Sequence, residues 1–300
     1  MPIRARGRRN LAPVAFVAPF LSLFALFFVL PIGYAVHQSL MGVERTGPLG
    51  LGGTRDVFVG LHNYGRALSE GAFVHSILRV LLFAAVQVPV MILLSTALAL
   101  LLDTASARGV RFFRTAYFLP YGVPGVIASI LWGFLYVPGV SPLVDLLDAT
   151  GIHLDLLGGT TVLWSIVNIV TWEFAGYNML VIVAQLRTIP GELYEAARID
   201  GATGWQTVRH VKRPLLRPAL VLTTVFTLIG TLQLFAEPLV LKPVSTSIGS
   251  TYTPNLSAYN EAFTNNDYNL AAAEAVLLAL AAFVLSFGFL RLINRRSQDT

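Results

Sequence analysis

The side chains in this sequence that could do chemistry are few, and three of them are carboxylates inside long apolar stretches. Glu173, Glu237 and Glu274 each stand among hydrophobic neighbours. An ionisable group at membrane depth is costly, and it marks a solute or ion pathway or a contact between helices. We expect Glu274, near the outer end of the last apolar stretch, to be a helix-start residue instead.

Enzyme chemistry finds little support in the remaining residues. The five histidines lie far apart in the sequence and show no metal-ligand spacing: His37, His62, His75, His153 and His210. The chain has no cysteine, which excludes thiolate catalysis, disulfides and cysteine-ligated metals. Neither a His-Glu-x-x-His nor a Gly-x-Ser-x-Gly motif is present. The sequence therefore predicts no catalytic residue and no metal site.

Aromatic and amide side chains accompany the carboxylates at membrane depth. A polar group facing lipid is unfavourable, so these side chains should face the interior of the helix bundle or a water-filled cavity. The predicted substrate-pathway residues are Trp172, Glu173, Tyr177, Asn178, Gln233, Phe235 and Glu237. In the alternative interpretation, Asn178 and Gln233 only bond neighbouring helices, and Glu237 only serves a kink at Pro238.

Six long apolar stretches place the chain in the membrane. Hydrophobic residues make up 55% and charged residues 12%, so a soluble protein of this composition could not cover its surface with polar groups. A stretch of roughly 20 apolar residues crosses a bilayer core. The predicted fold is an all-α polytopic membrane protein whose six spans lie near 14–38, 76–102, 113–136, 161–186, 218–241 and 270–293.

The basic residues predict the orientation of these spans. Of the 21 lysines and arginines, sixteen lie in the 1–13 arm, the 103–115 loop, the 187–217 loop and the C-terminal end. The positive-inside rule then places both termini in the cytoplasm and makes 39–75 an extracytoplasmic loop. The charge is a topology signal and does not predict nucleic-acid binding. The expected organisation is a cytoplasmic arm (1–13), a first helix (14–38), a five-helix core (76–293) and a cytoplasmic tail (294–300).

The long cytoplasmic loop has the pattern of two short helices joined by a tight turn. "TIPGELYEAARID" predicts the first helix, which Gly201 ends as a left-handed cap. Thr203 and Gln206 form a capping box that starts a second helix, which we expect Pro214 to stop. The small and apolar residues of this elbow favour either a protein-docking site or an amphipathic segment on the lipid surface.

The elbow resembles the EAA signature of permease subunits in binding-protein-dependent ABC importers. The matching residues are Glu195, Ala196, Ala197, Asp200, Gly201, Ala202 and Pro214. "FVGLHNYGRAL", "RTAYFLPYGVPGVIASILWGFLY" and "WEFAGYNMLVIVAQLRTIPGELYEAA" are similar to the maltose-type subgroup, so the resemblance spans residues 14–293. It implies a type I importer permease (MetI-like) fold in a bacterial inner membrane, and coupling to an ATPase through these residues together with Trp205.

The resemblance also implies a set of partners. They are a second homologous permease, two ATP-binding subunits, an extracytoplasmic solute-binding lipoprotein and a carbohydrate substrate. The chain has only two lysines, and neither stands in the Gly-Lys-Ser/Thr context of a phosphate-binding loop. We therefore expect no cofactor in this chain, with ATP and Mg bound by the partner ATPase subunits. An ion-coupled secondary transporter is the alternative, because three carboxylates lie at membrane depth.

Overall fold

The computed structural model describes residues 12–45, 53–103, 109–159 and 161–298. Most of the predicted basic arm, and the last two residues of the predicted tail, lie outside this part. The first half of the described chain contains α1 (Ala12–Phe24), η1 (Ala25–Val29), α2 (Leu30–Ser39), β1 (Met41–Arg45), β2 (Thr54–Phe58), α3 (His62–Ser69), α4 (Ala72–Leu102), α5 (Val110–Phe118), η3 (Leu119–Gly122) and α6 (Gly125–Tyr136). The second half contains α7 (Pro142–Ala149), α8 (Thr161–Leu186), α9 (Gly191–Ile199), α10 (Gly204–Thr207), η4 (Val208–Lys212), α11 (Arg213–Leu232), α12 (Ala236–Leu241), η5 (Lys242–Val244), α13 (Pro254–Phe263) and α14 (Tyr268–Gln298).

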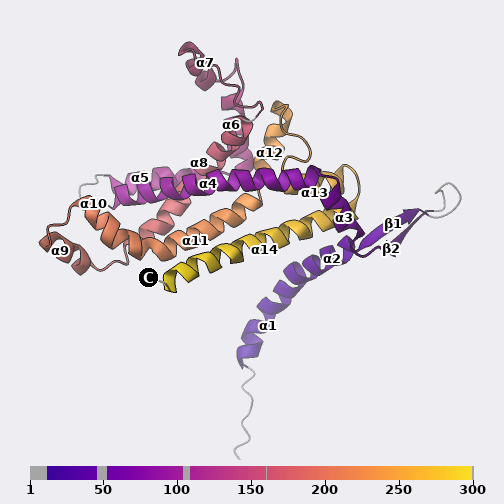
Figure 1. Ribbon diagram of the computed structural model, residues 1–300, viewed down its shortest axis with the longest axis horizontal. Helices are drawn as coiled ribbons and strands as arrows, with labels where there is room; N and C mark the ends of the chain where they lie inside the picture. The colour runs from indigo at the N-terminus through magenta and orange to yellow at the C-terminus, as the bar shows by residue number, and fades with distance from the viewer. Residues whose placement is uncertain (1–11, 46–52, 104–108, 160, 299–300) are drawn as a thin grey trace, which may run out of the picture.

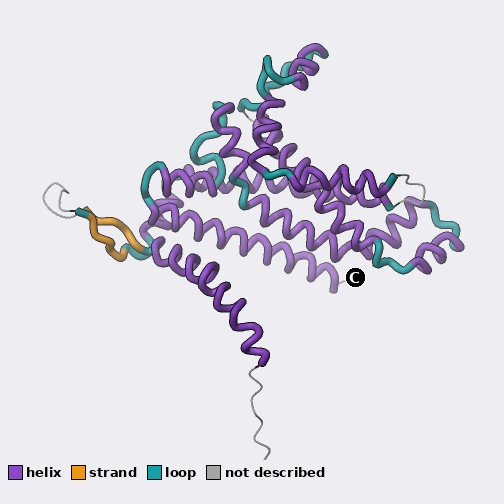
Figure 2. The backbone as a smooth tube through the Cα atoms, turned by 180° about the vertical axis from the view of Figure 1, so that it is seen from behind, coloured by secondary structure: helices purple, strands orange, loops and turns teal. Residues whose placement is uncertain are grey.

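Four long helices, α4, α8, α11 and α14, form the central bundle (Figures 1 and 2). Five helical stretches of the described chain are long and apolar enough to cross a membrane, and a bent helix pair makes a sixth. Their positions agree with the six predicted spans. The first of them, from α1 to α2, diverges from the bundle toward its N-terminal end, and its side chains are almost all exposed (Figure 1).

The third span departs from a single straight helix. Val110–Gly122 and Gly125–Tyr136 meet at an angle of 97°. Val123 is extended, with φ −85° and ψ 125°, because the ring of a following proline disfavours helical backbone. Pro124 then caps the start of α6. The sequence interruption at these residues is therefore a sharp turn between two helices.

The end of the molecule that carries α3 and α13 holds structure that the sequence did not predict. Within the predicted extracytoplasmic loop, β1 and β2 form an antiparallel hairpin with Met41 opposite Phe58. Asn63 at the start of α3 donates to the carbonyl oxygens of Ser39 (2.9 Å) and Met41 (2.7 Å), which holds the hairpin against α2. Arg66 on α3 forms an ion pair of 2.9 Å with Asp267.

The expectation for Glu274 is wrong. Asp267 caps α14, because its Oδ1 accepts from the backbone N–H of Leu270 at 3.0 Å. Glu274 lies one helical turn beyond Leu270, where it is buried and accepts a 3.1 Å hydrogen bond from the hydroxyl of Ser257 on α13. The sequence could not show that α13 folds back against this turn of α14.

Close packing of α8 against α4 and α5 depends on small residues. The Ser95 hydroxyl of α4 donates to the carbonyl oxygen of Ala175 at 3.0 Å. Gly176 follows directly, and a Cβ atom at this position would overlap the carbonyl oxygen of Tyr117 and lie 2.9 Å from the Cα of Phe118. Both neighbours are backbone atoms of α5, so they cannot yield by rotating a side chain. Gly176 sets the distance between the two helices.

We predict that Gly176→Ala pushes α5 away from α8 and destabilises the protein by on the order of 3 kcal/mol, as overpacking of a rigid contact does. Thermal unfolding in detergent measures this. Gly288→Ala is the matched control, since a Cβ on this α14 glycine meets nothing within 4 Å. Equal unfolding temperatures for the two variants would contradict the packing argument.

Candidate translocation cavity and coupling elbow

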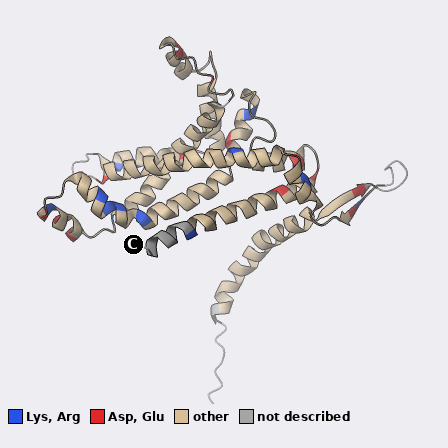
Figure 3. Cartoon of the chain, in the orientation of Figure 1, with Lys and Arg blue, Asp and Glu red and all other residues tan. Residues whose placement is uncertain are grey.

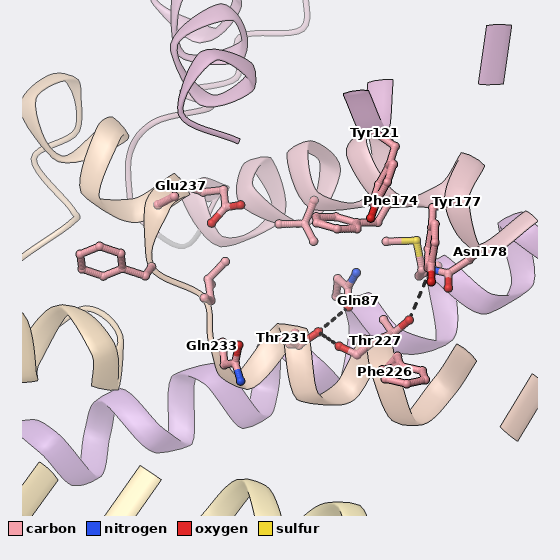
Figure 4. A pocket seen from close by; sticks show the side chains of 16 residues that line it. Gln87, Tyr121, Phe174, Tyr177, Asn178, Phe226, Thr227, Thr231, Gln233 and Glu237 are labelled. Atoms are coloured by element: carbon pink, nitrogen blue, oxygen red, sulfur yellow. Dashed lines mark hydrogen bonds between the residues drawn. The ribbon is translucent and has the colours of Figure 1, made fainter. Parts of the chain in front are cut away.

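A cavity of about 470 Å³ opens between α4, α8, α11 and the chain around α12. Its aromatic lining is Tyr121, Phe174, Tyr177, Phe226 and Phe235. Its polar lining is Gln87, Asn178, Thr227, Thr231, Gln233 and Glu237. Figure 4 shows Glu237 and Gln233 toward one end of the cavity and Tyr177 and Asn178 at the other, with Gln87 between them. An apolar wall with a few convergent polar groups is the usual make-up of a small-molecule site.

An interruption in the fifth span shapes one wall of the cavity. α11 ends at Leu232, and α12 begins at Ala236 after three residues without helical structure. Phe235 has φ −147° and ψ −53° there. Non-helical backbone at membrane depth is tolerated where it lines a cavity, and broken helices mark binding sites in other transporters. The break places Gln233 and Phe235 on the cavity wall.

A chain of polar contacts joins three helices beneath the cavity. The Thr231 hydroxyl of α11 lies 2.9 Å from Oε1 of Gln87 on α4 and 2.7 Å from the carbonyl oxygen of Thr227. Asn178 of α8 donates from Nδ2 to the Thr227 hydroxyl at 3.4 Å (Figure 4). Asn178 thus both bonds a neighbouring helix and lines the cavity.

Stacked aromatic rings form the opposite wall. Tyr121 and Tyr177 stack with ring centroids 4.8 Å apart and planes 19° apart. Phe174 meets Tyr121 edge-on at 5.8 Å. Tyr121 comes from η3, directly before the turn at Val123, so the bend in the third span brings this ring over α8.

The structure brings five of the seven predicted pathway residues to the cavity: Tyr177, Asn178, Gln233, Phe235 and Glu237. The other two lie elsewhere. Trp172 packs edge-on against Trp132, with centroids 5.8 Å apart. Glu173 is buried beside Gly125, where Glu237 also approaches, and its Oε2 atom has no hydrogen-bond partner among the described residues.

Sequence reasoning missed part of the lining. The missed residues are Gln87, Tyr121, Phe174, Phe226, Thr227 and Thr231. One signal was available for Gln87, because it is a polar residue in the middle of the apolar stretch 76–102. No comparable signal marks the aromatic residues, since most aromatics of a membrane protein face lipid or core.

At one end of the bundle α9 and α10 form the predicted elbow (Figure 1). Gly201 ends α9 with φ +74°, a left-handed conformation that other residues rarely adopt. The Thr203 hydroxyl accepts from the N–H of Gln206 at 3.3 Å, and the Thr203 N–H donates to Oε1 of Gln206 at 2.7 Å. The capping box and the glycine cap are confirmed.

The prediction that Pro214 stops the second short helix is wrong. α10 runs through the π-helical stretch η4 into α11 without leaving helical backbone, and Pro214 is the second residue of α11. Pro214 has no N–H to bond the preceding turn, and the wider π-helical turn of η4 directly before it accommodates the missing hydrogen bond. The elbow and the fifth span are thus one continuous rod.

The elbow exposes apolar side chains together with the small residues of the EAA segment. Ile199 is 86% exposed and Trp205 is 73% exposed. Glu195, Ala196, Asp200 and Gly201 are also exposed, and Ala197 and Ala202 are partly so. Lys and Arg gather at the same end of the bundle (Figure 3). Exposed large apolar side chains of this kind make the elbow a candidate interaction surface.

A partly buried ion pair ties the elbow to the core. Lys212, the last residue of η4, is only 8% exposed and lies 2.7 Å from Oδ2 of Asp103, at the end of α4. Its ammonium also lies 5.5 Å from the ring centre of Tyr194 on α9. Burial, with the Asp103 carboxylate nearby, raises the pKa of Tyr194. Lys212 therefore joins α9, η4 and α4 at one point.

Comparison with known proteins identifies the family. Residues 57–299 match the model of the binding-protein-dependent transport system inner membrane component. The chain belongs to this family of ABC transporter permeases. It is 34% identical to the sn-glycerol-3-phosphate transport system permease protein UgpA of Agrobacterium fabrum over 96% of each chain. It is 33% identical to the lactose transport system permease protein LacF of Rhizobium radiobacter, over 91% of this chain and 90% of that one.

A solved structure shares the fold. A chain of a bacterial alginate ABC transporter, solved in complex with an alginate pentasaccharide-bound periplasmic protein, superposes with a TM-score of 0.80 and 19% identity. The superposition covers 96% of this chain and 95% of that chain. The six-span importer permease fold expected from the EAA motif is confirmed.

We predict that Lys212→Met leaves the partly exposed Asp103 carboxylate without its partner and destabilises the protein by about 1 kcal/mol, between the effects of exposed and buried ion pairs. Thermal unfolding in detergent measures the effect. Lys242→Met removes the only other lysine, which is exposed, and serves as the control. If both variants unfold at the wild-type temperature, the ion pair does not anchor the elbow.

Proposed function

We propose that the chain is the permease subunit of an ATP-driven carbohydrate importer and forms half of its translocation pathway. The observation that carries this proposal is the connection between two sites. The cavity wall at Gln233 and the exposed elbow at Trp205 are the two ends of one helical rod. Aromatic faces beside amide and hydroxyl groups suit a sugar, and LacF, one of the relatives named above, belongs to a lactose transport system.

The elbow is proposed as the dock for an ATPase subunit. Ile199 and Trp205 supply apolar anchors, and Ala196 and Ala197 permit close approach of a partner backbone. Glu195, Asp200, Gly201, Ala202 and Pro214 complete the EAA match. ATP and Mg would be bound by two ATPase subunits, and a second, homologous permease would supply the other half of the pathway.

The proposed location is a bacterial inner membrane, with both termini and the elbow on the cytoplasmic side. The cluster of Lys and Arg at the elbow end supports this orientation through the positive-inside rule (Figure 3). A solute-binding lipoprotein would then deliver substrate at the opposite end, where α3 and α13 lie. The alginate transporter, which was solved with its periplasmic protein, gives a precedent for that partner.

We predict that Gly201→Pro abolishes coupling while the chain still inserts in the membrane. Proline requires φ near −65°, which the left-handed backbone at Gly201 (φ +74°) excludes. The tagged chain is purified gently from its native membrane, and its partners are identified by mass spectrometry. Wild type should retain an ATPase and a second six-span protein, and Gly201→Pro should lose the ATPase.

The matched control is Gly204→Pro. Gly204 is the first residue of α10, and Thr203 before it is already extended (ψ 161°), so a proline is accommodated there. This variant should retain both partners. An ATPase that stays bound to the Gly201→Pro chain would rule out the elbow as its dock. A wild-type chain that purifies alone and still transports would favour ion coupling instead.

A further inference from the structure

Gln87 in α4 is fully buried, yet its side-chain amide is only half satisfied. It has 0% exposure and lies on the cavity wall. Its Oε1 atom bonds the Thr231 hydroxyl at 2.9 Å, whereas Nε2 has no hydrogen-bond partner among the described residues. Figure 4 shows this nitrogen directed into the cavity. A buried polar atom without a partner is costly, so such an atom at a cavity points to a ligand.

The position of the amide suits a sugar. The stacked rings of Tyr121 and Tyr177 form the wall across the cavity, and aromatic faces of this kind pack on sugar rings. A sugar hydroxyl both donates and accepts hydrogen bonds. It could therefore bond the free end of the Gln87 amide whether that end is the nitrogen or the oxygen. The polar contacts behind Gln87, to Thr231 and on to Thr227, hold the amide in place for such a contact.

The charge of the cavity favours a neutral substrate over a phosphorylated one. The Glu237 side chain lies at one end of the lining. Among the described lining residues no Lys or Arg is present to pair with a phosphate. Sugar hydroxyls, in contrast, can donate to the Glu237 carboxyl group and to the free carbonyl oxygens at the end of α11.

We propose that Gln87 is a substrate-binding residue that recognises a hydroxyl group of a neutral carbohydrate through the amide end facing the cavity. This inference rests on the carbohydrate transport proposed above and adds a residue and a substrate class to it. Gln87 discriminates by hydrogen bonding, and the Tyr121–Tyr177 pair supplies the apolar contact.

The test uses the purified transporter complex in lipid nanodiscs without its solute-binding protein. Radiolabelled lactose, maltose, cellobiose and sn-glycerol 3-phosphate are the probes, and equilibrium dialysis gives each Kd. The wild type should bind at least one disaccharide more tightly than the phosphate. Gln87→Leu should raise the Kd of that disaccharide about tenfold, the effect of one lost hydrogen bond in a buried site.

Two further variants separate recognition from structure. Ser95→Ala removes a buried hydroxyl from the same helix, away from the cavity lining, and should leave the Kd within about twofold of wild type, because it loses only a weak interhelical bond. Gln87→Asn keeps an amide in α4 but withdraws it by one methylene, so it should raise the Kd in the same direction as Gln87→Leu, and it also serves if the leucine variant does not assemble.

Equal disaccharide affinities in wild type and both Gln87 variants would overturn the role of Gln87 and leave the carbohydrate function standing. An equal loss of disaccharide affinity in Ser95→Ala would also overturn the role of Gln87. A wild-type complex that binds none of the disaccharides, whether or not it binds sn-glycerol 3-phosphate, would overturn the carbohydrate function itself.

Discussion

The need to satisfy every backbone hydrogen bond in lipid governs this structure. It forces the chain into helices across the membrane and permits irregular backbone only where protein or a cavity surrounds it. Two irregular places in the described core lie at the cavity: the turn at Val123 directly follows the segment that carries the lining residue Tyr121, and the break at Gln233–Phe235 is itself part of the lining. The first brings Tyr121 over α8, and the second exposes Gln233. The breaks in the helices therefore form part of the site itself.

The tight contacts around α8 hold this site open at a defined width. Gly176 allows α5 to approach to backbone contact at the carbonyl oxygen of Tyr117 and the Cα atom of Phe118. Tyr177 and Asn178 follow directly in the sequence and line the cavity. Residues without functional side chains thus position those that have them.

Local chemistry was predictable from the sequence, and contacts between distant segments were not. The Gly201 cap and the Thr203–Gln206 box depend on neighbouring residues, so their patterns specify the geometry. Pro214 was misjudged because the π-helical turn directly before it accommodates the missing hydrogen bond. Glu274 and Tyr121 depend on how α13 and η3 fold onto other helices. No pattern along the chain records that packing.

The continuity of α10, η4 and α11 has a mechanical consequence. The rod from Gly204 to Leu232 is about 40 Å long at the usual rise of a helix. A tilt of about 10° about Lys212 would carry Leu232, about 30 Å away, through about 5 Å, roughly the width of a sugar ring. The ion pair between Lys212 and Asp103 joins the rod to α4 near its elbow end, so it is the natural pivot of such a tilt. A small movement outside the membrane could in this way become a large change of shape at its centre.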